Sequence, residues 1–310
     1  RRAARALQAA FLDCADGAPM LLPRMLPVGD FGDDDGGLLS LSLSDDTGSD
    51  LPPPISNIRR QICLSKLLRH FPLGEQYPSQ PQAMRLAESL GQLLDQLYNV
   101  DATAEQLRDL LPDHFSAHWQ DILTLLRILI DRWPTILEEE GLIDVVDRRN
   151  QLLRRRANQW REEPPDQLIV IAGSTGSIFA TRELIGVVAK LPNGHIVLPG
   201  LDRHADNQWQ AICEDSGHPQ YQLAQLLAYL EITPDQVQNW TGATDQIPPE
   251  LSARRNLMRE VFRPAAISKG WQRLGDASLM IDRTALAGLK VITAKDRREE
   301  ANLIALSLRE

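Results

Sequence analysis

Apolar side chains recur at helical spacing along much of the first half of the chain. Residues 1–13 are rich in Ala, Leu and Arg and have no helix breaker, which predicts a helix. A second helix is predicted over 84–98, where one apolar stripe consists of Ala87, Leu90, Leu94 and Leu97. Further helices are expected over 116–132 and 145–160. Because no strand pattern interrupts residues 55–163, we expect that region to be nearly all helix.

The pattern changes after residue 163. Residues 168–172 (LIVIA) are apolar and rich in β-branched side chains, as in a strand that is buried on both faces. A helix is expected over 181–191, and a second strand over 196–198 follows the turn at Pro192. Strand, helix and strand within about 30 residues are typical of a parallel βαβ unit. A third strand is expected over 289–293.

These elements predict an α/β fold in which a helical block interrupts a parallel sheet. The expected segments are 1–54, the first part of the α/β domain; 55–163, the inserted helical subdomain; 164–247, the remainder of the α/β domain; and 248–310, a linker and the start of a second domain. Since the sequence opens on Arg1 inside a helical pattern and closes without a C-cap glycine, we expect a piece of a longer protein.

Composition narrows the classes of function. The 310 residues carry a net charge of −9, which disfavours independent DNA binding, because neutralising phosphates needs a basic surface. Any DNA contact is therefore expected to be local or supplied by a partner. No apolar run is long enough for a membrane span and no signal-peptide pattern is present. The three separated cysteines fit a reducing compartment, so a cytoplasmic location is expected.

The most distinctive chemical feature is a Gly-rich turn between the first predicted strand and the helix after it. Its candidate phosphate or DNA contacts are Gly173, Ser174, Thr175, Gly176 and Ser177. Backbone N–H groups at a helix N-terminus favour an anion. However, the sequence lacks the Lys of a nucleotide-hydrolysing phosphate loop. Two interpretations stay open: a tight turn whose glycines allow close packing of helix and strand, and an anion site.

Arginines supply the other candidate DNA contacts. Arg154 and Arg155 belong to a basic helix, and Arg1, Arg2 and Arg5 lie in the first helix. Each group has two interpretations, a solvated helix face or phosphate contact. No catalytic residue is assigned. No metal site is assigned either: His114 and His118 have the spacing of a zinc motif, but Phe115 stands where such enzymes have Glu.

Several long stretches together resemble one family. They are LLPRMLPVGDF at 21–31, PPPISNIRRQICLSKLL at 53–68, HWQDILTLLRILIDRWPTILEEEGLIDVVDRRNQLL at 118–153, and IAGSTGSIFATRELIGVVAKLPNGHIVLPGLD at 171–202. Residues 1–11 and 291–310 also match in order. The stretches resemble the AddB subunit of AddAB helicase–nucleases, of the alphaproteobacterial type, which act in double-strand break repair.

The resemblance implies a RecA-like α/β domain of the superfamily-one helicase type with an inserted helical domain. It also implies a subunit that is not the motor, that contacts double-stranded DNA ends and single-stranded DNA, and that docks on an AddA-like motor and nuclease partner. The complete complex is expected to use ATP and Mg²⁺, and no cofactor is expected in this region. The family's nuclease domain would lie beyond Glu310. An alternative is a phosphate- or nucleotide-binding α/β enzyme that uses the 172–177 turn.

Overall fold

The computed structural model describes residues 2–28, 50–70, 77–102, 106, 131–203, 208–239, 248–268 and 282–309. Of these residues 59% are helical and 4% lie in strands. The described residues contain one sheet, which has two parallel strands. The expected RecA-like α/β fold is therefore wrong, because such a core is built on a larger parallel sheet. Most of the predicted helix over 116–132 lies outside the described residues.

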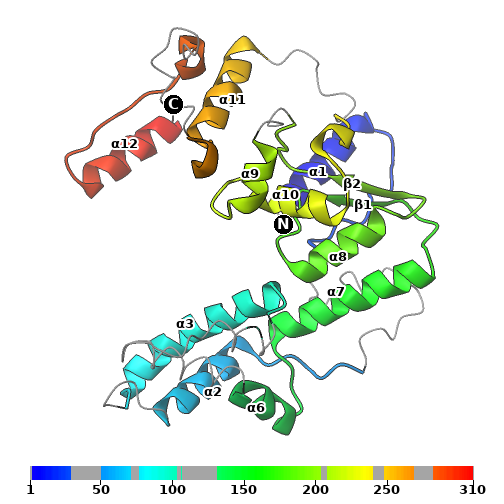
Figure 1. The fold of residues 1–310 in the computed structure, drawn as a ribbon, viewed down its shortest axis with the longest axis vertical. Coiled ribbons are helices and arrows are strands. Elements are labelled where there is room, and N and C mark those ends of the chain that lie inside the picture. The colour runs from blue at the N-terminus through cyan, green and yellow to red at the C-terminus, as the bar shows by residue number, and fades with distance from the viewer. Residues whose placement is uncertain are drawn as a thin grey trace. The chain divides into compact units, whose positions relative to one another are not determined.

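The chain divides into two compact units. Their helices and strands are labelled in Figure 1. Unit 1 consists of residues 1–201 and 225–232, and unit 2 consists of residues 202–224 and 233–310. These units do not test the four segments expected from the sequence, which stay a prediction.

Unit 1 begins with helices. They are α1 (Arg2–Cys14), α2 (Asn57–Arg69), α3 (Gln80–Asn99), α6 (Trp133–Glu139) and α7 (Val145–Glu162). Ser79 and Gln82 form a capping box at the start of α3, with the Ser79 N–H donating to Gln82 Oε1 over 2.9 Å. The predicted stripe of α3 is buried at Ala87, Leu90 and Leu94. Together with residues of α2 and α6 it forms a helical core cluster. The predicted helical character of 55–163 is confirmed for the part that the structure describes.

A small βαβ unit follows α7. It comprises β1 (Ile169–Ala172), α8 (Phe179–Val188) and β2 (Gly194–Val197). The strands are parallel, with Ile169 opposite Gly194 and Ala172 opposite Val197. The predicted parallel unit is thus confirmed, although α8 begins two residues before the expected start at Thr181.

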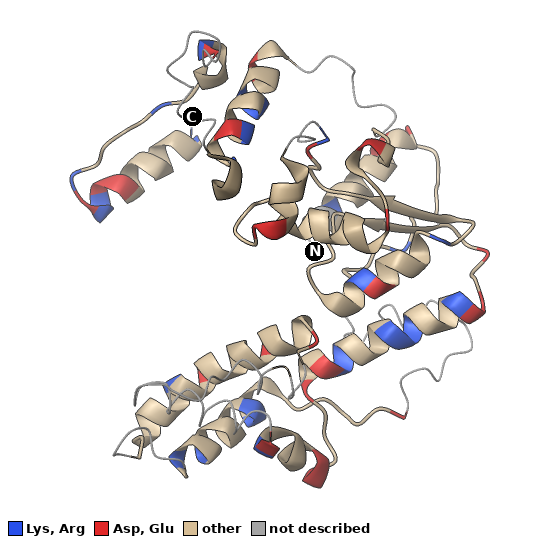
Figure 2. Cartoon of the chain, viewed as in Figure 1, with Lys and Arg blue, Asp and Glu red and all other residues tan. Residues whose placement is uncertain are grey.

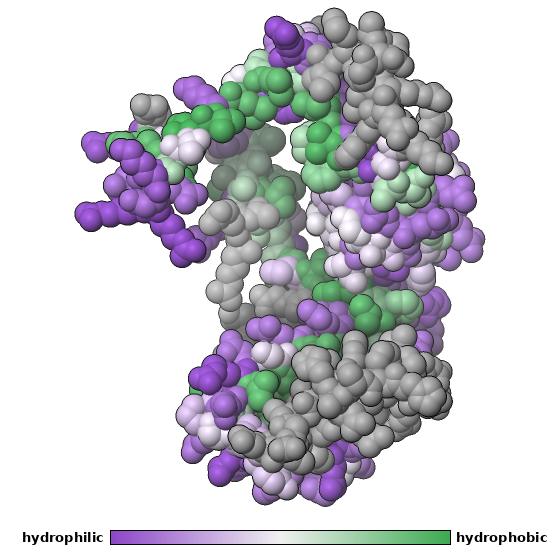
Figure 3. Space-filling model, turned by 60° about the vertical axis from the view of Figure 1, so that its left-hand side comes forward, coloured by the Kyte–Doolittle hydropathy of each residue, from purple (hydrophilic) through white to green (hydrophobic). Residues whose placement is uncertain are grey.

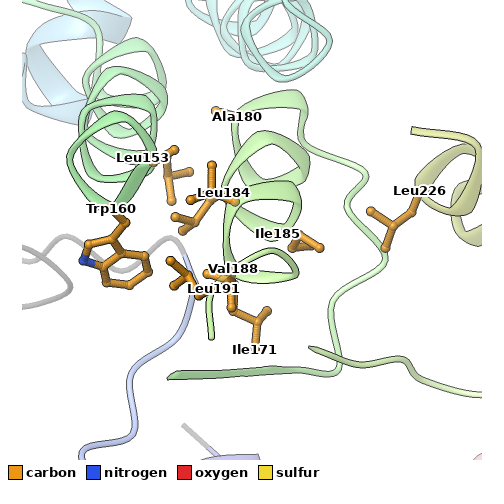
Figure 4. Packing of buried hydrophobic residues seen from close by; sticks show 11 residues of the cluster. Leu153, Trp160, Ile171, Ala180, Leu184, Ile185, Val188, Leu191 and Leu226 are labelled. Carbon is orange, nitrogen blue, oxygen red and sulfur yellow. The ribbon is translucent and has the colours of Figure 1, made fainter. Parts of the chain in front are cut away.

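The core around α8 joins the strands to α7. Leu184, Ile185 and Val188 of α8 are at most 1% exposed. Leu184 lies on the side of Leu153 of α7, Val188 lies near Ile171 of β1, and Ile185 is on the side facing Leu226 (Figure 4). Trp160 of α7 points toward Leu191, just beyond the end of α8 (Figure 4). This core holds α7, α8 and the sheet in one unit and fixes where the turn after β1 lies.

Unit 2 is also helical where it is described. Its elements are α9 (Trp209–Glu214), the start of α10 (Tyr221–Tyr229), the 3₁₀ helix η3 (Pro234–Gln236), α11 (Pro249–Val261), the 3₁₀ helix η6 (Arg283–Leu286) and α12 (Arg297–Arg309). Thr233 is the N-cap of η3, which is only three residues long. A two-pronged ion pair joins Arg259 of α11 to Asp202, with both N–O distances 2.7 Å.

The third predicted strand does not form. Residues 289–293 make no ladder with any described residue, and Val291 is 94% exposed. Residues 20–28, an apolar stretch that contains Pro23 and Pro27, are likewise unpaired in the described chain. Exposed hydrophobic residues appear in green in Figure 3. None of the described helices is long and apolar enough to cross a bilayer.

Candidate functional site

The Gly-rich turn runs from the carboxyl end of β1 to the N-terminus of α8. The Gly173 N–H donates to the Val197 carbonyl over 2.9 Å, which extends the strand pairing by one residue. Beyond it, residues 174–177 belong to neither strand nor helix. The carboxyl end of parallel strands is the usual place for ligands in α/β units.

Two glycines of the turn adopt left-handed backbone conformations. Gly173 has φ 75° and Gly176 has φ 64°, values that side chains disfavour. A Cβ on Gly176 would lie 3.1 Å from Leu226 Cδ1, whereas a Cβ on Gly173 would meet nothing within 4 Å. The packing interpretation therefore holds at Gly176, which is buried. It does not explain Gly173, which is exposed.

The N-terminus of α8 has no side-chain cap. Ile178 occupies the N-cap position, and its side chain makes no cap hydrogen bond to the helix. The first helical turn contains no acidic residue. Uncapped N–H groups carry the positive end of the helix dipole, and they favour an anion at this position.

The side chains of the turn supply hydroxyls and one neighbouring cation. Ser174 and Thr175 are half-buried and Ser177 is exposed. The Gly176 N–H donates to Ser174 Oγ over 3.3 Å, and Arg182 Nε donates to the Gly176 carbonyl over 3.0 Å. The turn thus offers hydrogen-bond donors near a guanidinium, and residues 173–177 include no carboxylate, imidazole or amine. It has groups that hold an anion and none that acts as a base.

Arg182 is the residue that sequence reasoning missed. It follows Gly176 by six positions, in the first turn of α8, and its side chain lies over Gly176. The signal was its place just after a Gly-rich turn, but the helix was expected to start at Thr181, with no contact back to the turn.

The arginines of α7 are engaged within the protein. Figure 2 marks their positions in blue along the ribbon of the helix. Arg154 forms ion pairs with Glu183 (2.8 Å) and Asp101 (2.9 Å). Arg155 pairs with Asp50, and its hydrogen bond lowers the pKa of that carboxyl. These ion pairs go to Glu183, Asp101 and Asp50, none of which belongs to the turn, so they do not join the arginines and the turn into one site.

The N-terminal arginines are separate again. Arg5 is exposed on α1 and has no partner among the described residues. Arg2 lies in α1, and Arg1 lies outside the described residues. His114 and His118 lie outside them too. Within the described ranges, no three His, Cys, Asp or Glu side chains gather as a metal-binding group.

Comparison with known proteins identifies no family or function for the chain. No protein-family description, curated protein or solved structure matches the chain.

Proposed function

We propose that this chain is a non-motor scaffold region of a double-strand break repair helicase–nuclease subunit. In this role it holds the DNA backbone and docks on a motor and nuclease partner that supplies the ATP- and Mg²⁺-dependent steps. Its DNA would be a duplex end with a single-stranded tail, in the cytoplasm. The proposal does not include a RecA-like fold, which the mostly helical described chain contradicts.

One observation carries the proposal. The turn after β1 has hydrogen-bond donors that can bind an anion, and it has no side chain that could catalyse nucleotide hydrolysis. The N-terminus of α8 is uncapped, Gly173 leaves open space beside it, and Arg182 lies at the turn. A DNA phosphate needs only such donors and a nearby cation. ATP hydrolysis also needs groups that bind the terminal phosphates and Mg²⁺.

The resemblance to AddB subunits gives the proposal its biological setting. Its stretch at 171–202 contains the turn, α8 and β2. The net charge of −9 agrees with a chain that contacts DNA locally within a complex rather than through a broad basic face.

Introducing a negative charge into the turn tests whether it binds a DNA phosphate. Ser177 is exposed, so Ser177→Asp adds a carboxylate with little packing cost. Two like charges about 4 Å apart repel by about 1–4 kcal/mol, depending on their exposure to water. We expect affinity for a forked DNA duplex to fall by about tenfold. Fluorescence anisotropy of a labelled fork, measured over a series of salt concentrations, gives the dissociation constant.

The matched control is Ser216→Asp, which makes the same change at an exposed turn of unit 2. It should bind the fork like the unmodified chain. Equal affinities of the two variants would remove the turn from the DNA contact. DNA-stimulated ATP hydrolysis by the purified chain would instead favour the enzymatic alternative and overturn the scaffold role.

A further inference from the structure

A pocket of about 340 Å³ lies in unit 1, away from the Gly-rich turn. It forms where three helices end, and its lining comes from the C-terminal parts of α7, α8 and α10 and the residues just after them. This volume is at the lower end of the range of about 300–1,000 Å³ that small-ligand pockets occupy.

The walls of the pocket are apolar and aromatic. Val187, Leu191 and Leu230 supply aliphatic surface. Trp160 is almost fully buried in the core around α8, and the Arg156 guanidinium lies 5.8 Å from its ring centroid, so it presents little of its ring. Tyr229 is 43% exposed, so it is the aromatic side chain that a ligand can reach.

Gly186 sets the position of Tyr229. A Cβ at Gly186 would lie 2.8 Å from Tyr229 Cε1, closer than side-chain atoms approach one another. The missing side chain therefore lets the tyrosine ring lie directly against α8. The result is an exposed aromatic ring on one wall of the pocket, held against a helix.

Two cations complete the lining. Lys190 forms no ion pair with any described residue, and Arg161 donates from Nη1 to the amide oxygen of Asn158 (2.5 Å) without a carboxylate partner in the described chain. The carboxylate of the pocket, Glu183, is already paired with Arg154 at 2.8 Å. In a chain of net charge −9, this lining has an excess of positive charge.

We propose that this pocket holds one unpaired nucleotide of a single DNA strand, an inference that rests on the proposed function. The base stacks on Tyr229 over the apolar wall, and the adjoining phosphate lies near Lys190 and Arg161. Aromatic stacking accepts any base, and cations follow the backbone, which together are the usual means of binding single strands. The same chemistry would accept a free nucleoside monophosphate, so the test separates the two sources.

The test compares a twelve-residue oligothymidine with an abasic strand of the same length and charge. In the full chain, Tyr229→Ala should weaken oligothymidine binding by about tenfold and leave abasic-strand binding unchanged. Tyr229→Phe keeps the ring and should bind like the unmodified chain. Lys190→Gln should weaken both strands and reduce the salt dependence by about one phosphate contact. The matched controls are Tyr77→Ala and Lys66→Gln, which change exposed side chains elsewhere in unit 1.

Each other outcome has a definite meaning. Equal oligothymidine affinity of Tyr229→Ala and the unmodified chain overturns the pocket, and so does an equal loss for the abasic strand. If thymidine monophosphate binds through Tyr229 but oligothymidine does not, the pocket takes free nucleotides and the strand proposal is wrong. If Ser177→Asp loses fork binding while Tyr229→Ala binds oligothymidine normally, the pocket proposal is wrong and the role of the turn stands. If Tyr229→Ala loses oligothymidine binding while Ser177→Asp binds the fork normally, the role of the turn is wrong and the pocket proposal stands.

Discussion

Asp144 joins more partners than its size suggests. It is fully buried, accepts the backbone N–H of Val146 at the start of α7, and accepts the Trp133 indole N–H over 3.2 Å. Arg60 Nε lies 2.9 Å from its carboxylate. One side chain thus caps α7 and fastens α2 and α6 to it.

Removing this carboxylate should destabilise unit 1 strongly. Asp144→Ala leaves the buried Arg60 guanidinium without its buried partner, and breaking such pairs typically costs about 3–5 kcal/mol. Urea denaturation followed by circular dichroism measures the loss. Asp95 pairs with the same arginine but is 39% exposed, so Asp95→Ala should cost about 1 kcal/mol or less. Similar losses for the two variants would contradict the central place of Asp144.

His218 makes the stability of unit 2 dependent on pH. Burial lowers its pKa below the ordinary value of 6.5, although Asp215, the Phe262 backbone and Asp202 favour the charged form. The Gln220 N–H donates to His218 Nδ1 over 3.0 Å, a bond that protonation of this nitrogen abolishes. The folded state therefore prefers neutral imidazole.

Because the unfolded chain takes up this proton at higher pH than the folded chain, the free energy of unfolding should fall as pH drops below about 6.5. Urea midpoints between about pH 7.5 and 5.5 should show this loss, and His218→Gln should reduce it. His195→Gln, at an exposed position of β2, is the control. An unchanged pH dependence in His218→Gln would remove this histidine as its source.

At this scale the sequence predicts some contacts and misses others. The glycines of the turn were identifiable because a Gly-rich segment after a buried strand is a local signal. Arg182 over Gly176, and Arg154 paired with Glu183 29 positions later, depend on how α8 lies beside the turn and α7. Local spacing carries no information about such distant pairs.

The backbones of α8 and β2 approach each other very closely at Gly194. A Cβ on Gly194 would lie 1.9 Å from the Val188 carbonyl oxygen, so any side chain forces the backbone apart. Gly194→Ala should destabilise the chain by about 1–3 kcal/mol, as overpacking does. Gly91 in α3 has only ordinary contacts, the nearest at 3.8 Å, so Gly91→Ala should stabilise the chain by about 0.5–1 kcal/mol. Opposite shifts in thermal midpoint are expected, and equal shifts would contradict the clash.

Helices and strands were predicted correctly where the hydrophobic pattern extended over many neighbouring residues. The stripe of α3 and the β1–α8–β2 unit are confirmed, with ends displaced by a few residues. The strand expected at 289–293 is wrong because a short apolar run indicates an extended chain at most. A strand needs a neighbouring strand to receive its backbone hydrogen bonds, and residues 289–293 pair with no strand among the described residues.

For the whole molecule, the fold class was the largest error. Each apolar run after residue 163 was assigned to one parallel sheet, and the resemblance to helicase subunits favoured the same conclusion. The described chain instead builds its cores mainly from helices, and its sheet stops at β1 and β2. Secondary structure was more predictable than architecture because the number of strands in a sheet depends on long-range pairing.

The position of α7 has a mechanical consequence. Its first part is tied to the helical cluster, where Asn150 Nδ2 donates to the Tyr98 carbonyl over 2.7 Å. Its later part supplies Leu153, Ala157 and Trp160 to the core around α8. At 18 residues it spans about 27 Å with continuous backbone hydrogen bonding. The helix α7 therefore belongs to both the helical cluster and the core around α8. A displacement of the helical cluster is transmitted to the sheet through this continuous helix, without an intervening loop.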